Sequence, residues 1–129
     1  MGNDAVDVAA LAELVDAVAG RLRSLGEGRL GRPPMRVGLG LPEPARTDGP
    51  SVADRGFAVA SELVVAAAQL EDVQPPPLPR LGDLVVGDQV AVTGHDLVAA
   101  LRRCPSDDPS AAEALQTAHS ALKALHHEL

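Results

Sequence analysis

Heptad spacing near the start of the chain is the feature that most constrains its fold. Apolar residues recur there at intervals of three and four positions for nearly three heptads: Val8, Leu11, Val15, Val18, Leu22 and Leu25. This spacing places them on one face of a helix. Acidic residues occupy the first turns, Arg21 and Arg23 the last, and Gly26 is typical of a helix end. We therefore predict a helix over about residues 4–25.

Three further segments carry helix signals. Ser51 to Asp54 is typical of an N-terminal capping box, and a broad apolar stripe follows it to about residue 72. A similar pattern from Thr93 to Asp96 predicts a short helix over about 94–103. The best capping box, Ser110 to Glu113, opens a helix predicted over about 110–128. Its stripe again has spacings of three and four: Leu115, Ala118, Leu122, Leu125 and Leu129.

Residues 84–92 are the strand-like part of the sequence. Two β-rich triplets, 84–86 and 90–92, flank a Gly-Asp pair, which is typical of a tight hairpin. The predicted fold class is therefore mainly α. Four helices pack as a small bundle, with a short β-hairpin at about 84–92 lying against them.

Small side chains dominate the material available for a core. The 129 residues include 22 Ala, 18 Leu and 15 Val but one Phe and no Trp or Tyr. A core without aromatic rings buries little area per residue and suits helices that lie close together. We predict a single helical domain over 1–129, interrupted by a Gly/Pro-rich flexible loop at 26–50 and a polyproline spacer at 74–80.

Charge and cysteine content exclude several classes of function. The chain carries 11 basic and 18 acidic residues, a net charge of −7, which disfavours binding to nucleic acids or to anionic membranes. One cysteine, Cys104, cannot form a disulfide framework. The first twenty residues lack the basic start of a signal peptide, so we expect a cytoplasmic protein. The predominance of Arg over Lys suggests a GC-rich bacterial genome.

Motifs that suggest chemistry lack the context that the chemistry needs. Residues 26–31 match G-x-G-x-x-G, but a predicted helix precedes them where dinucleotide binding needs a strand. His95 and Asp96 are neighbours at a predicted helix start and do not face one another. His119 and His126 are about 10 Å apart along a helix, too far to share a metal ion. We predict no cofactor, no metal and no enzymatic activity.

The leading functional hypothesis is a protein–protein interaction or assembly module, acting as a homodimer or with a partner chain. The residues expected at its interface lie on the two heptad stripes: Val8, Leu11, Val15, Val18, Leu22, Leu115, Leu122 and Leu125. The alternative is a small ligand-binding or regulatory domain whose 26–50 loop holds an anion through Arg29, Arg32, Arg36 and Arg46. A third possibility, a small enzyme built around His95, needs a distant acid or nucleophile beside that histidine.

Overall fold

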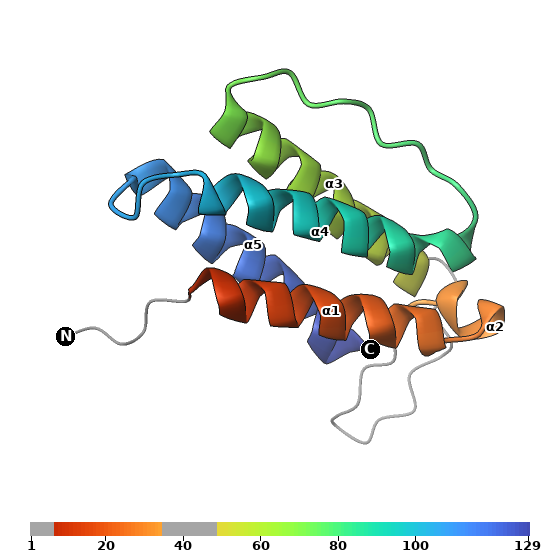
Figure 1. The fold of residues 1–129 in the computed structure, drawn as a ribbon. Helices are drawn as coiled ribbons and strands as arrows, with labels where there is room; N and C mark the ends of the chain where they lie inside the picture. Colours follow the sequence, from red (N-terminus) through yellow and green to blue (C-terminus); the bar gives the residue numbers. More distant parts are fainter. Residues whose placement is uncertain (1–6, 35–48) are drawn as a thin grey trace.

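The computed structural model describes residues 7–34 and 49–129, and four long helices make up most of this part of the chain (Figure 1). The elements are α1 (Val8–Ser24), α2 (Glu27–Leu30), α3 (Val52–Glu71), the 3-10 turn η1 (Asp83–Val85), α4 (Val86–Arg102) and α5 (Pro109–Glu128). The predicted mainly α bundle is confirmed. The helices expected at 4–25, 51–72 and 110–128 correspond to α1, α3 and α5.

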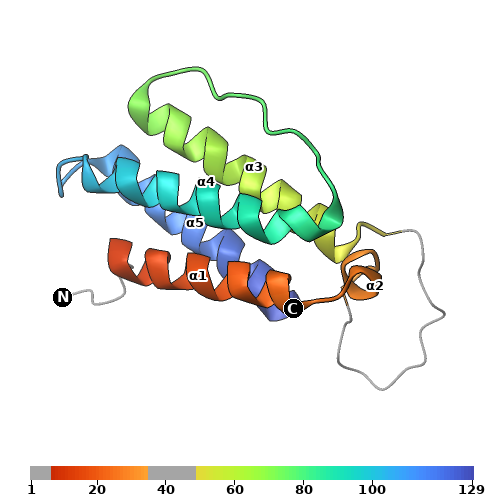
Figure 2. The same cartoon turned by 45° about the vertical axis from the view of Figure 1, so that its right-hand side comes forward.

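The four long helices form a bundle in which α1 and α3 each pack against both α4 and α5. α1 runs parallel to α5, and α3 runs parallel to α4 in the opposite direction (Figure 2). Contacts at the helix ends agree with this arrangement. Arg21, near the end of α1, donates to the carbonyl of Leu129 at 2.9 Å, and Arg103, just after α4, pairs with Glu71 at the end of α3 at 3.5 Å.

Parallel neighbours need a connection that returns along the bundle, and residues 72–82 provide it. The segment contains neither helix nor strand and runs back outside the bundle from the end of α3 to the start of α4 (Figure 1). An extended chain of this length covers about 34 Å at ~3.1 Å per residue, and α3 is about 30 Å long at ~1.5 Å per residue. The proline-rich sequence is therefore long enough to span α3 once.

The predicted hairpin at 84–92 is wrong, because these residues form η1 and the first part of α4. The helix expected at 94–103 accordingly begins eight residues earlier, at Val86. Thr93 does not cap a helix; its hydroxyl donates to the carbonyl of Gln89, 2.8 Å away, inside α4. The β-branched valines favour strands, but burial of Val86 and Val90 in the bundle outweighs that weak preference.

Gly87 belongs to the predicted hairpin turn, but Gly87 and Gly94 both serve close helix packing in the structure. A Cβ placed on Gly87 would lie 3.1 Å from the carbonyl oxygen of Ala19 on α1. One placed on Gly94, seven residues later on the same face, would lie 2.5 Å from Val15. Both glycines therefore let α1 approach α4 more closely than alanine would allow. α4 is correspondingly well buried, and its covered apolar residues are Val86, Val90, Leu97, Val98, Ala100 and Leu101.

The Gly/Pro-rich segment predicted at 26–50 contains a regular element that was not expected. α2 begins after Gly26, whose carbonyl accepts from the amides of Arg29 and Leu30 at 3.0 Å. The side chain of Leu30 is 1% exposed and joins the core. Burial of Leu30 and a hydrogen bond from the amide of Val52 to the carbonyl of Arg32 at 2.8 Å hold this single helical turn against α3. Residues 35–48 of the predicted loop lie outside the described part of the chain.

One helical stretch, Asp83–Arg102, is long and apolar enough to cross a membrane by length and composition alone, with a mean hydropathy of 1.3. However, 56% of its most apolar window is buried inside the bundle. A core helix meets the same criteria, so this match is weak evidence for a membrane span.

Candidate functional site

The residues predicted for an intermolecular interface lie mainly in the core of the single chain. Six of them are at most 2% exposed: Leu11, Val15, Val18, Leu22, Leu122 and Leu125. Val8 and Leu115 are partly buried against the same core. The two heptad stripes are thus covered by the other helices of the bundle. A partner would have to bind a different surface unless the bundle opened.

The four arginines of the alternative anion site are only partly within the described residues. Arg29 lies on α2 and is partly buried, and Arg32 is exposed just after it. Arg36 and Arg46 lie outside the described part of the chain. A ligand-binding role for these four side chains therefore stays a prediction.

His95 does meet a distant acid, as the third hypothesis required. Its Nε2 atom lies 2.7 Å from Oδ1 of Asp16, which joins the middle of α4 to α1. Both side chains are about half exposed or more, at 48% and 69%, and neither lines the hollows between α3 and α5. An Asp–His pair needs a third group and a binding cleft to act in catalysis. The His95–Asp16 interaction therefore links α4 to α1 and has the geometry of a structural contact between helices.

Other reactive groups are dispersed. Cys104 is partly buried after α4, and its thiol donates to the carbonyl of Ala100 at 3.3 Å. Within residues 7–34 and 49–129, no three His, Cys, Asp or Glu side chains are grouped closely enough to hold a metal ion.

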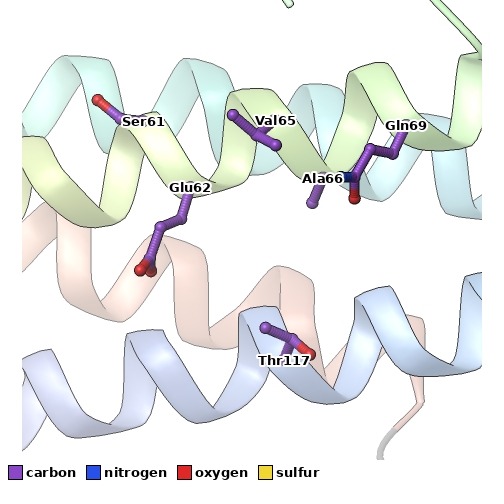
Figure 3. A pocket seen from close by; sticks show the side chains of 6 residues that line it. All are labelled: Ser61, Glu62, Val65, Ala66, Gln69 and Thr117. Atoms are coloured by element: carbon purple, nitrogen blue, oxygen red, sulfur yellow. The ribbon is translucent and has the colours of Figure 1, made fainter.

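A shallow groove runs between α3 and α5. It consists of two adjoining hollows of about 370 and 260 Å³ that share Glu62. The larger is lined by Ser61, Glu62, Val65, Ala66, Gln69 and Thr117 (Figure 3). The smaller continues towards the end of α5, along Arg55, Ala58, Val59, Glu62, Ala121, Ala124 and Leu125. The smaller hollow is lined mainly by aliphatic side chains, whereas four of the six residues that line the larger one are polar; of its two apolar residues, Val65 is 42% exposed. We call this surface the α3–α5 groove.

The charges of the groove are unevenly balanced. At one end, Arg55 of α3 donates to the carboxylate of Glu128 on α5, so these two charges neutralise each other. Glu62, where the two hollows meet, extends from α3 towards α5 (Figure 3) and forms no ion pair with a described residue. The centre of the groove therefore carries a net negative charge between walls that combine aliphatic and uncharged polar side chains.

Reading the sequence for apolar residues alone missed this groove, although a signal was present. The α3 residues that line it most openly recur at intervals of three and four: Arg55, Ala58, Glu62, Val65 and Gln69. Because three of these five are polar, the stripe resembles an ordinary solvated helix face. The heptad spacing was the detectable feature.

A second polar cluster anchors the crossover to the start of α3. Arg80 lies 3.0 Å from both Asp54 and Asp83, and its guanidinium stands 5.5 Å from the centre of the Phe57 ring. The hydrogen bond from Arg80, helped by the backbone amide of Ser51, lowers the pKa of Asp54. The same bond with Asp54 raises the pKa of Arg80. These ion pairs hold the crossover against α3. Because each charge of the cluster already has a partner, we assign the cluster a structural role.

Comparison with known proteins identifies no relative: no family model, curated protein or solved structure matches the chain.

Proposed function

We propose that this protein is a non-catalytic protein–protein interaction module that binds its partner through the α3–α5 groove. The observation that carries the proposal is the groove itself, an elongated surface of aliphatic and polar side chains left uncovered along two antiparallel helices. Grooves of this form accept the apolar face of an amphipathic helix. The heptad stripes of α1 and α5 supply the stable core on which this surface is built.

A non-catalytic role fits the chemistry of the described residues. The His95–Asp16 pair, Cys104 and the Arg80 cluster lie in different parts of the fold, and each has a structural partner. None of them lines the α3–α5 groove. An interaction surface needs only shape and complementary chemistry, which the groove provides.

Site-specific photo-cross-linking tests this proposal. A benzophenone amino acid replaces Val65 in the groove or, as the control, Val92, which is 61% exposed on α4. In cells that naturally express the chain, we expect a discrete adduct from position 65 and none of the same mass from position 92. The adduct should disappear when Ala124→Arg fills the groove and persist with Ala99→Arg, the same change at an exposed site on α4.

The outcome against the proposal is equally defined. If positions 65 and 92 give the same adducts, or if Ala124→Arg leaves the adduct unchanged, the groove is not the binding surface. An adduct of twice the mass of the chain would identify the partner as a second copy.

A further inference from the structure

Resting on the proposed function, we infer that the α3–α5 groove binds an amphipathic helix of about four turns that carries a Lys or Arg side chain opposite Glu62. The partner is thus a different chain with a basic residue in the middle of an apolar helix face. The length of the groove determines the length of the bound helix, and the charge of Glu62 determines the central residue of that helix.

The two walls of the groove present matching helical registers. On α3 the outward stripe runs from Arg55 to Gln69, and on α5 the lining residues Thr117, Ala121 and Ala124 are spaced by four and three positions. A third helix laid between these stripes can contact α3 along its whole length and α5 along the part from Thr117 to Leu125. The α3 stripe covers about 21 Å at ~1.5 Å per residue, which corresponds to a partner helix of about 14 residues.

The side chains at the middle of the smaller hollow permit close approach. Ala58 and Ala124 are exposed and Ala121 is partly buried. Because these residues end at Cβ, an occupant can place its own Leu or Val side chains between the two helices at an ordinary interaxial distance of about 8–10 Å.

Glu62 determines the charge of the occupant. A helix covering the groove removes water from this carboxylate, which is costly unless a cation replaces the lost hydration. Arg55 cannot provide that cation without leaving Glu128. The occupant must therefore bring its own basic side chain to the position where the two hollows meet.

The same residue argues against a second copy as the occupant. Glu62 belongs to both hollows and so lies near the middle of the groove. In a dimer with two-fold symmetry about that point, the two Glu62 carboxylates would face each other, because a symmetric interface pairs each patch with itself. Such like-charge contacts are unfavourable, and each chain already carries a net charge of −7.

A displayed library of 18-residue helical peptides tests the inference with the full chain. In this library, each heptad core position is Ala, Val or Leu. Each position of one central turn can be any of the twenty amino acids. It is selected separately against the wild-type chain and against Glu62→Lys, with Glu62→Gln as the uncharged control. Binding of each selected peptide is then measured on Ala124→Arg and on the matched Ala99→Arg.

The expected result is an enrichment of Lys or Arg at one central position for the wild type and of Asp or Glu there for Glu62→Lys. Peptides selected on the wild type should bind Glu62→Lys at least about tenfold more weakly, and peptides selected on Glu62→Lys should bind the wild type as weakly, because like charges then meet in the groove. Ala124→Arg should weaken binding by a similar factor, and Ala99→Arg should leave it unchanged. Circular dichroism confirms that each variant is folded.

Three outcomes would overturn the inference and have different consequences for the proposed function. Peptides that bind the groove without a central charge preference refute the basic helix and leave the interaction module standing. Peptides that ignore Ala124→Arg, or no binders at all, refute both. A dimer in sedimentation that Ala124→Arg dissociates identifies a second copy as the occupant and refutes the basic partner alone.

Discussion

Gly94 of α4 lies directly against Val15 of α1: a Cβ built on Gly94 would be 2.5 Å from Cγ1 and 2.7 Å from Cγ2 of Val15. Val15 is fully buried and β-branched, so it has no free space to turn away. This contact brings the two helices together at the residue where the sequence pattern predicts the start of a short helix.

Gly94→Ala should therefore destabilise the protein although alanine is the better helix former. Overpacking costs about 1–3 kcal/mol, which outweighs the ~1 kcal/mol gained in helix propensity. The matched control is Gly20→Ala, on the exposed side of α1, where an added Cβ meets nothing within 4 Å. That variant should gain about 0.5–1 kcal/mol. Urea unfolding of both variants checks the prediction, and equal shifts would contradict the close packing.

Leu122→Ala should reduce stability by about 2–5 kcal/mol, because it leaves a cavity in the core. Leu122 is 0% exposed within the single chain, so the loss should be the same at every protein concentration. Thermal unfolding across a hundredfold range of concentration measures this. Leu84→Ala, at a side chain 58% exposed, should stay within about 0.5 kcal/mol of wild type. A loss that recovers on concentration would place Leu122 at an interface.

Arg80→Met should weaken the dependence of stability on acid. The pKa of Asp54 is lowered in the folded state, chiefly by its bond with Arg80. The stability that ionised Asp54 contributes is therefore fully present above its pKa in the unfolded chain, about 4. This stability is lost as the pH falls through the lower pKa of Asp54 in the folded state. Asp54 is 53% exposed, so solvent screening limits the effect to about 1 kcal/mol or less. The urea midpoints at pH 6 and pH 3 should therefore lie closer together in Arg80→Met than in wild type; an equal difference in both proteins would contradict the role of Arg80.

Shortening the crossover should cost more than softening it. Without Pro76 and Pro77, residues 72–82 would reach only about 28 Å at ~3.1 Å per residue, so the connection would strain the start of α4. Replacing Pro75, Pro76 and Pro77 by Gly-Ser-Gly keeps the length and should cost about 1–3 kcal/mol, through the greater freedom of the unfolded chain. Differential scanning calorimetry compares the two variants. A smaller loss of stability from the deletion than from the replacement would show that the crossover is longer than it needs to be, which would contradict the prediction.

Local pattern was sufficient for three of the long helices. Ser51 and Asp54 form the predicted capping box at the start of α3, and the stripes of α1 and α5 are buried as heptad stripes should be. These features depend on residues three or four apart, so they can be read along the chain. The last capping box was misread in detail, because Asp108 rather than Ser110 caps α5.

Residues close together in the chain thus specify a helical bundle with a small-residue core and most of its helix boundaries. The identity of α4, the pairing of His95 with Asp16 and the uncovered α3–α5 groove were decided only by the tertiary structure. Gly87 favours a turn when read locally, and it serves helix contact only because α1 lies against it. Likewise, a heptad stripe predicts that one face of a helix is buried, but which helix buries that face depends on how all four long helices pack. The groove exists because that packing covers the stripes of α1 and α5 and leaves the open sides of α3 and α5 exposed.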